Sequence, residues 1–304
     1  MRSTIDLQPA DPPADPSATT ASVTYHLPSP ALREAITAYY LVKVSGSGVV
    51  RDQIFPEWPN FRLVLSGEWE ATFPDADPAP VPAAGVTGAL ERAVWVSGSA
   101  GLMVGVGLMP QGWPRLTSAP AGEFTNRMRP LSDALGPVAD ELHRRLSAAE
   151  SDEAIFAVLD EVFTAMLTEA PEVAQVAAAH IALQDPKVQT VSDWAAAFGV
   201  SSRQLERFTL RYLGLPPKRL LRRQRLLRTL AAMRESDGGT WSQFIDAHFA
   251  DQAHFIHEFN YYMGTTPKAY LARPQPIMGE AWKRRKALLG APVQVLQPPT
   301  KRKT

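Results

Sequence analysis

The spacing of apolar residues divides the chain into a strand-rich part followed by two helical parts. Apolar residues alternate with other residues over 61–65 and again over 69–73, with Gly and Pro between such runs. This period of two predicts mostly β structure for residues 40–115. Before it, Pro30 and helical spacing over 32–40 predict a short helix. From 131 to 183 apolar residues recur every three or four positions, which predicts a run of helices.

The last third of the chain contains an internal repeat at an offset of 50 residues. Matching pairs are Ser192/Ser242, Tyr212/Tyr262, Gly214/Gly264, Pro217/Pro267, Lys218/Lys268, Leu221/Leu271 and Arg223/Arg273. One helical unit therefore occurs twice.

Each copy of the unit has the layout of a helix-turn-helix. In the first, a helix over 191–198 precedes a turn and a serine-capped helix over 203–213. In the second, a support helix over 241–247 precedes a helix capped by Asp251. A continuous helix over 217–234 joins them and spans roughly 27 Å at about 1.5 Å per residue. Successive major-groove segments lie about 34 Å apart, so one monomer is expected to read two adjacent half-sites.

Charge is distributed unevenly along the chain, although the formal net charge is zero. Residues 1–186 contain 11 Lys and Arg against 23 Asp and Glu, whereas residues 187–304 contain 20 against 8. This asymmetry indicates that the second half is a segment that binds nucleic acid or a membrane surface. It also raises the hypothesis that the acidic half covers the DNA-binding face when no signal is present.

The absence of cysteine excludes several chemistries at once. With none among 304 residues, disulfides, thiol catalysis, thiolate zinc sites and iron–sulfur clusters are ruled out. The composition fits a reducing cytoplasm. The N-terminus does not have the pattern of a signal peptide, and the uncharged stretch over 93–114 is interpreted as buried strands, so no membrane partner is expected.

Residues 187–273 resemble the DNA-binding domain of AraC/XylS-type transcription regulators. The resemblance rests on "WAAAFGVSSRQLERF", "LGLPPKRLLRRQRLLR" and "ADQAHFIHEF…MGTTPKAYL". It implies a bacterial, cytoplasmic transcription activator with an all-α domain of two helix-turn-helix units joined by a long helix. The implied base-contacting residues are Arg203, Glu206, Arg207, Gln252, Ala253, His254 and His257. The expected phosphate contacts are Ser202, Arg211, Lys218, Arg222, Arg223 and Lys268.

Two of these residue types allow another interpretation. Glu206 could orient a neighbouring arginine instead of accepting from cytosine. His254 and His257 lie three apart on one helix face, a metal-ligand spacing, but His248 is the only third ligand nearby, so no metal site is expected.

A looser resemblance links "FPEWPNFRLVLSG", "VGVGLMPQGW" and "RMRPLSDALG" to the β-rich domain that precedes this module in one regulator subgroup. We therefore predict an α+β chain whose N-terminal domain is β-rich and half-barrel or cupin-like. Trp58, Arg62, Trp69 and Trp95 are candidates to line an effector pocket. The alternative is that these tryptophans pack in the core or on the surface.

No catalytic constellation, cofactor motif or metal motif is found in the acidic half, so an enzyme is not expected. The favoured function is a sequence-specific transcription regulator controlled by a signal sensed by the N-terminal domain. The alternative keeps the DNA-binding half but makes residues 1–130 a protein-interaction module without a small-molecule effector. A DNA-modifying enzyme is disfavoured, because alkyl-transfer repair requires cysteine.

Double-stranded DNA is the expected partner, and RNA polymerase, a small-molecule effector and a second copy of the chain are further candidates. The expected segments are a disordered N-terminus (1–22), a β-rich domain (23–130), a helical connector (131–184), the double helix-turn-helix (187–273) and a basic, partly disordered tail (274–304).

Overall fold

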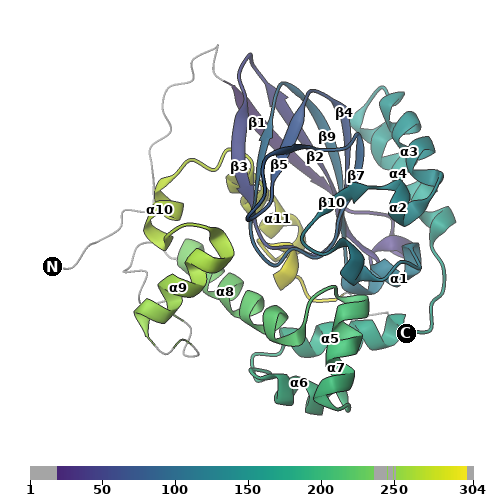
Figure 1. Ribbon diagram of the computed structural model, residues 1–304. Helices are drawn as coiled ribbons and strands as arrows, with labels where there is room; N and C mark the ends of the chain where they lie inside the picture. The colour runs from purple at the N-terminus through teal and green to yellow at the C-terminus, as the bar shows by residue number, and fades with distance from the viewer. Residues whose placement is uncertain (1–18, 236–244, 246–248, 250, 300–304) are drawn as a thin grey trace.

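A computed structural model describes residues 19–235, 245, 249 and 251–299, and places a β-rich part before a helical part (Figure 1). Within these residues the strands form a six-stranded sheet, β1-β2-β9-β4-β7-β10, and a four-stranded sheet, β3-β8-β5-β6. All neighbouring strands are antiparallel. The strands are β1 (Thr20–His26), β2 (Ile36–Ser45), β3 (Val50–Ile54), β4 (Asn60–Ser66), β5 (Trp69–Thr72), β6 (Ala79–Pro80), β7 (Ala84–Thr87), β8 (Val94–Gly98), β9 (Gly101–Leu108) and β10 (Met128–Pro130).

The helix expected over 32–40 is wrong. A short 3-10 helix, η1 (Pro30–Leu32), is followed directly by β2, which pairs with β1 on one side and β9 on the other. Most of β2 is buried on both faces, so its sequence is a nearly continuous apolar run without alternation. Such a run fits helical spacing by chance, while its aromatic and β-branched residues favour a strand.

The helices fall into two groups. The first covers the six-stranded sheet, where buried side chains of α3 and α4 share one core with strands β2, β4, β7 and β9. The second surrounds α8, and its core also contains Phe55, Trp58, Ala89 and Ala93 from the β-rich domain. The helices are α1 (Trp113–Leu116), α2 (Ser132–Leu135), α3 (Val138–Ser147), α4 (Asp152–Met166), α5 (Val173–Gln184), α6 (Val191–Phe198), α7 (Ser202–Tyr212), α8 (Pro217–Glu235), α9 (Gln252–Met263), α10 (Pro267–Ala272) and α11 (Met278–Leu289).

The C-terminal tail, expected to be partly disordered, is helical over much of its described part. Residues 278–289 form α11, and residues 294–296 form a short 3-10 helix, η5. Ile277, Ala281 and Trp282 are buried, and α11 packs against β1 and β3 of the β-rich domain. The basic run over 283–286 made this amphipathic helix hard to predict from the sequence. Three of its four charged residues lie on the exposed side of the helix.

The α+β fold class predicted from sequence is confirmed: a β-rich N-terminal region precedes a helical C-terminal region. At the N-terminus, β1 begins at Thr20, inside the segment expected to be disordered, and residues 1–18 lie outside the described residues. The predicted support helix over 241–247 also lies outside them, apart from residue 245. No helix of the described residues is long and apolar enough to cross a membrane.

Candidate nucleic-acid interface and cavity

The first helix-turn-helix is defined by two capping boxes. Thr190 and Asp193 exchange hydrogen bonds at the start of α6, and Ser201 and Gln204 do the same at the start of α7. Between them Gly199 adopts a left-handed backbone with φ of 73°, which a glycine accepts without a steric cost. The two capping boxes and the glycine turn together fix the angle between α6 and α7.

The N-terminal half of α7 presents its polar side chains to solvent. Arg203, Glu206 and Arg207, the expected base contacts, are all exposed, whereas Leu205 and Thr209 are fully buried. In the described part of the chain, no ion pair engages Arg203 or Arg207, so both are available to a partner. The β-rich domain therefore leaves the N-terminal side chains of α7 exposed in this structure.

The second recognition helix, α9, is capped by Asp251, whose carboxylate Oδ1 accepts a hydrogen bond from the His254 backbone N–H at 2.8 Å. Gln252, Ala253 and His257 are exposed, as the sequence predicted for base contacts. His254 is partly buried, with its ring 5.5 Å from that of Phe249. Among the described residues, no group of three His, Cys, Asp or Glu side chains is placed to hold a metal ion.

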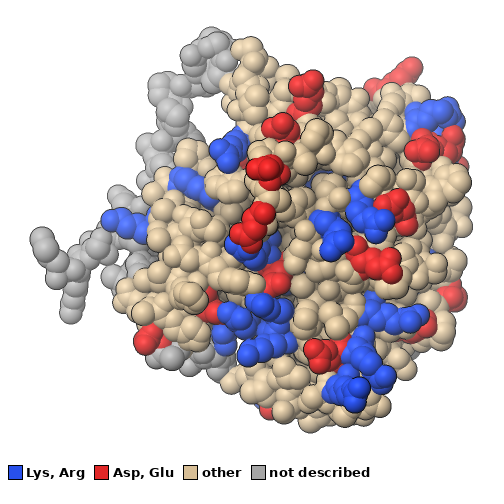
Figure 2. Space-filling model, viewed as in Figure 1, with Lys and Arg blue, Asp and Glu red and all other residues tan. Residues whose placement is uncertain are grey.

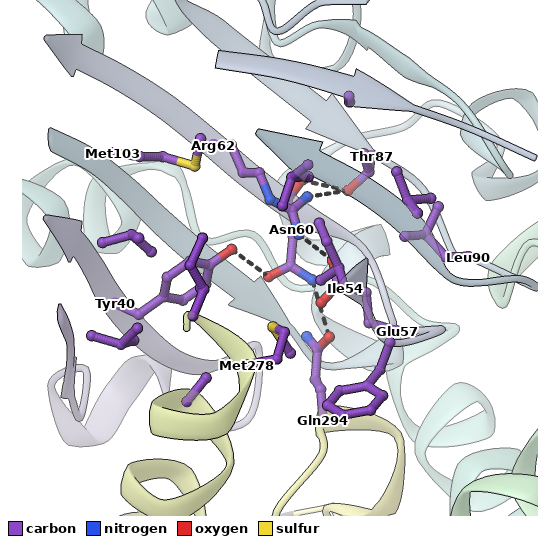
Figure 3. A pocket seen from close by; sticks show the side chains of 18 of the residues that line it. Tyr40, Ile54, Glu57, Asn60, Arg62, Thr87, Leu90, Met103, Met278 and Gln294 are labelled. Carbon is purple, nitrogen blue, oxygen red and sulfur yellow. Dashed lines mark hydrogen bonds and ion pairs between the residues drawn. The ribbon is translucent and has the colours of Figure 1, made fainter. Parts of the chain in front are cut away.

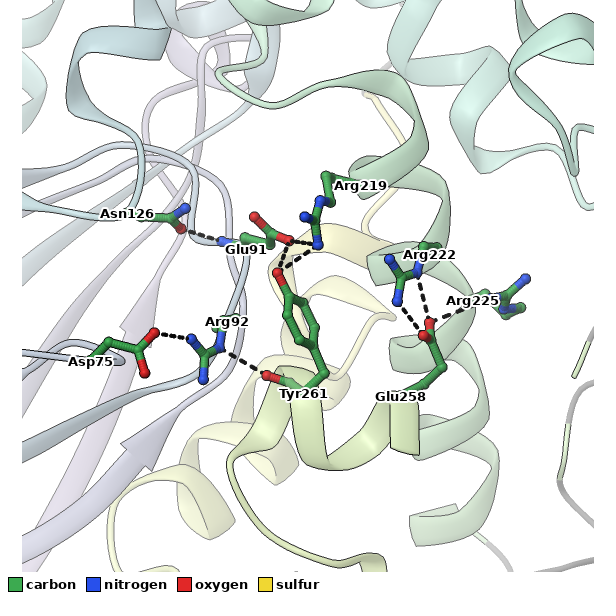
Figure 4. Close-up of polar contacts among 9 residues, drawn as sticks. All are labelled: Asp75, Glu91, Arg92, Asn126, Arg219, Arg222, Arg225, Glu258 and Tyr261. Carbon is green, nitrogen blue, oxygen red and sulfur yellow. Dashed lines mark hydrogen bonds and ion pairs between the residues drawn. The ribbon is translucent and has the colours of Figure 1, made fainter. Parts of the chain in front are cut away.

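Two of the expected phosphate contacts, Arg222 and Arg223 of α8, bond to groups within the protein, and Figure 4 shows Arg222 beside Glu258. Arg222 makes a bidentate ion pair with Glu258 of α9, with its Nε 2.9 Å from Oε2. Arg225 approaches the same carboxylate at 3.5 Å. Arg223 is fully buried, and Nη1 donates to the backbone carbonyls of Glu57 and Leu90 at 3.1 and 2.8 Å.

Burial determines the ionisation of these groups. Desolvation lowers the pKa of Arg223 to about 9, so the guanidinium still carries its charge at neutral pH. Burial raises the pKa of Glu258, but the hydrogen bonds and charge of Arg222 outweigh it and hold that pKa below its usual range. Both groups are therefore charged parts of the interior.

A polar cluster joins the β-rich domain to both α8 and α9 (Figure 4). Arg219 of α8 lies 2.9 Å from Glu91 and donates to the Tyr261 hydroxyl at 2.5 Å. Tyr261 in turn donates to Glu91 at 2.8 Å, and the Arg92 side chain donates to the Tyr261 carbonyl at 2.9 Å. Attraction between the acidic and basic halves thus acts at α8 and α9 rather than over the exposed face of α7.

The remaining expected phosphate contacts lie on the surface of the protein. Ser202, Arg211, Lys218 and Lys268 are exposed. Figure 2 shows Lys and Arg side chains gathered over α7 and over α8 on the viewed face.

A cavity of about 90 Å³ lies between the two sheets of the β-rich domain (Figure 3). Its walls are mostly apolar, and one end is polar, where Arg62 pairs with Glu57 and donates to Thr87 Oγ1 at 2.6 Å. Asn60 accepts from the Tyr40 hydroxyl at 3.3 Å and donates to Gln294 at 3.0 Å. Burial lowers the pKa of Arg62, but the Glu57 carboxylate more than offsets this and raises it overall, so Arg62 stays charged.

The four residues proposed for an effector pocket separate into three places. Arg62 and Trp69 line the cavity. Trp58 is wrong as a pocket residue: it is fully buried in the core around α8, with the Arg223 guanidinium 4.2 Å from its ring centroid. Trp95 borders a separate open hollow and lies between Arg51 and Arg273, at 4.7 and 4.6 Å.

Sequence reasoning missed the cavity residues supplied by the tail. Arg285 and Gln294 both line the cavity and are buried. The spacing of Ile277, Ala281 and Arg285, four residues apart, was the available signal for a buried helix face. Similarly, Arg223 lies three residues after Leu220 and four before Leu227, on the apolar stripe of α8.

The family model for a helix-turn-helix domain matches residues 194–273. Comparison with curated proteins found no match. Among solved structures, ToxT from Vibrio cholerae O395 has a TM-score of 0.42 and 11% identity, over 84% of this chain and 96% of that chain. ToxT from V. cholerae strain SCE256 with bound unsaturated fatty acid has a TM-score of 0.40 and 11% identity, over 84% and 94%. The AraC-like transcriptional activator CuxR has a TM-score of 0.29 and 15% identity, over 69% and 87%.

The exposed, capped recognition helix of a helix-turn-helix and the matching family model define the class: this is a DNA-binding transcription regulator. Residues 194–273 form a helix-turn-helix domain of the AraC type, preceded by a β-rich domain, and the family resemblance stated from sequence is confirmed.

Proposed function

We propose that this protein is a sequence-specific regulator that reads two adjacent major-groove segments, one with α7 and one with α9. The observation that supports this proposal is that two capped helices, one before α8 in the chain and one after it, expose their N-terminal side chains. The 19 residues of α8 span about 28 Å, the order of one groove repeat. Since the partner is the chromosome, we infer that the protein acts in the cytoplasm.

The proposed readers are Arg203, Glu206 and Arg207 on α7, with Gln252, Ala253 and His257 on α9. An arginine can donate two hydrogen bonds to guanine O6 and N7, which gives discrimination of about 1–3 kcal/mol. Ser202, Arg211, Lys218 and Lys268 are proposed to contact phosphates, which adds affinity without sequence information.

Two arginines on the same helix separate these roles. Arg207→Ala should weaken binding to the selected duplex by about 5- to 150-fold and leave binding to random duplex nearly unchanged. Arg211→Ala, the matched control, should weaken both alike and reduce the salt slope by about one. Equal losses on both duplexes for the two variants would show that α7 does not read sequence.

We further propose that the cavity between the sheets is an effector site. Trp69 Nε1 and Arg285 Nε are buried at its wall and have no hydrogen-bond partner in the described structure. Buried donors without partners are costly, so they favour a ligand that brings acceptor atoms. The mostly apolar walls require that the rest of the ligand be apolar.

A thermal-shift screen of small molecules on the full chain tests this site. A ligand of the cavity should raise the melting temperature with concentration, and Arg62→Met should remove that shift. If no compound stabilises the chain and a protein co-purifies with it instead, the β-rich domain is an interaction module without an effector.

A further inference from the structure

The wall of the cavity nearest the C-terminus comes from beyond the DNA-binding domain. We call residues 277–297 the C-terminal strap. From it, Met278, Ala281 and Arg285 of α11 and Gln294 of η5 line the cavity. Figure 3 shows Met278 and Gln294 on this wall. The segment that follows the second helix-turn-helix therefore closes the proposed effector site of the first domain.

Side-chain contacts at two points hold the strap on the β-rich domain. At one end, Asp52 Oδ2 of β3 accepts hydrogen bonds from the backbone N–H groups of Ile277 at 2.9 Å and Met278 at 2.7 Å. At the other, Gln294 pairs with Asn60 and donates to the Leu108 carbonyl at 2.8 Å. Most of the other lining residues lie on strands held by backbone ladders. Among the described residues, the strap is held on the sheets by side-chain contacts and packing and by no such ladder.

The cavity is too small for most ligands while the strap is docked. It encloses about 90 Å³, whereas ligand pockets usually measure roughly 300–1,000 Å³. Protein interiors are close-packed and resist compression. A ligand that fills a pocket of the usual volume can therefore bind here only if one wall of the cavity moves outward.

The strap also packs against the elements that position α9. Trp282 of α11 lies under the Arg234 guanidinium of α8, 4.3 Å from its ring centroid, and 5.6 Å from the Phe55 ring. Arg234 donates to the Tyr270 hydroxyl of α10 at 3.0 Å, and Tyr270 packs on Phe259 of α9 with ring centroids 5.6 Å apart. Packed side chains thus connect the cavity wall to the core of the second recognition helix.

A second connection runs through β3, next to the residue that caps α11. Gln53 follows Asp52, and its amide nitrogen donates to the Met263 carbonyl, at the end of α9, at 2.8 Å. Its Oε1 accepts from Arg273 at 2.6 Å. One strand therefore holds both the start of the strap and the end of α9.

We propose that the C-terminal strap is a two-state wall: it is docked when the cavity is empty and displaced when the cavity is filled, and its displacement repositions α9 relative to α7. The proposal rests on the proposed function, because it assigns regulation to the same cavity and the same recognition helices. A change at the cavity then alters reading of the α9 half-site and leaves the α7 half-site alone.

Thiol labelling measures strap opening directly, because the chain has no cysteine. Ala281→Cys places a thiol at a position that is 4% exposed in the docked strap, where a maleimide reacts only during opening. Ala287→Cys, on the exposed side of the same helix, is the control and should react fast in every background.

Two perturbations should open the strap. Asp52→Ala removes the cap and should accelerate labelling of the A281C thiol about tenfold, whereas Glu280→Gln, which removes the Arg284 pair on α11, should not. Val42→Trp fills the cavity from β2 and should accelerate labelling of the A281C thiol. Val86→Trp is the control: it overfills the core on the other side of the six-stranded sheet and should leave this labelling unchanged. Unchanged labelling in D52A and V42W, or equal acceleration in V86W, would overturn the proposal.

Binding to half-sites tests the connection to α9. On a duplex selected by the full chain, D52A and V42W should change affinity for the α9 half by about fivefold or more, with the α7 half nearly unaffected. Equal effects on both halves, or none, would overturn the connection. If the unsubstituted chain selects no sequence, the proposed function fails instead, and the labelling result still decides whether the strap opens.

Discussion

Replacing Arg222 with alanine should destabilise the fold rather than remove a contact to DNA. In the structure the guanidinium makes two bonds to Glu258, whose side chain is 3% exposed, while 26% of the Arg222 side chain is exposed. Removing the arginine leaves a buried carboxylate on the second recognition helix, with the more distant Arg225 and His254 as its remaining neighbours of positive charge in the described residues.

The expected magnitude follows from this burial. Removing one partner of a fully buried ion pair costs about 3–5 kcal/mol. Because Arg222 is partly solvated and Arg225 stays 3.5 Å from Glu258, we expect about 2–3 kcal/mol for Arg222→Ala. The R222A/E258A double variant should lose less than the sum of the single variants, with a coupling of about 2 kcal/mol.

Urea unfolding of the full chain gives the stability change, and DNA titrations over a salt series give the number of phosphate contacts. Arg222→Ala should shift the urea midpoint and leave the salt slope unchanged. Lys218→Ala is the matched control on the same helix: Lys218 is exposed, so this variant should reduce the slope by about one and alter stability by less than about 0.5 kcal/mol.

The opposite pattern for Arg222 would refute the structural role. If Arg222→Ala leaves the urea midpoint unchanged and reduces the salt slope by about one, Arg222 contacts a phosphate, as the sequence alone suggested.

Three other changes are informative. Burial, with the charge of Arg223, lowers the pKa of His180 to about 3, so below about pH 6.5 the unfolded chain binds a proton that the native protein does not. The free energy of unfolding should therefore fall by about 1.4 kcal/mol per pH unit as the pH drops from 6 to 4. In urea titrations at several pH values, His180→Gln should lose this pH dependence. A variant with the same dependence of stability on pH as the unsubstituted protein would contradict the prediction. Arg223→Met removes the Arg223 donor from the Leu90 carbonyl, while the Glu57 carbonyl keeps the Leu90 N–H, and it should cost about 2 kcal/mol in urea unfolding with no change in salt slope; a reduced slope would place Arg223 on DNA. Ser201→Ala should cost about 1 kcal/mol and speed amide exchange in the first turn of α7; unchanged exchange would show that the cap is not needed.

The helix-turn-helix was predictable because its determinants are local. Caps at Ser201 and Asp251, the turn at Gly199 and the apolar spacing within each helix all lie within a few residues of what they define. The repeat then showed that the unit occurs twice, and the exposure of Arg203 and Arg207 followed from the same periodicity.

The predictions that were wrong depended on contacts between distant segments. Arg223 was counted as a surface charge because its carbonyl partners, on Glu57 and Leu90, lie more than 130 residues away. The first residues of β2, 36–40, were mistaken for part of a helix because a strand buried on both faces has no alternation. The tail over 274–304 was interpreted as partly disordered because its charges are visible in the sequence, whereas the sequence does not show the sheet that buries Ile277 and Ala281.

Selection of duplexes from a random pool by the full chain tests the central claim most directly. Two recognition helices on one rigid α8 predict an enriched site with two conserved parts whose centres lie about 10 base pairs apart. Arg207→Ala should relax one part and Gln252→Ala the other. An enriched pool without a common sequence, or with one part only, would contradict the account.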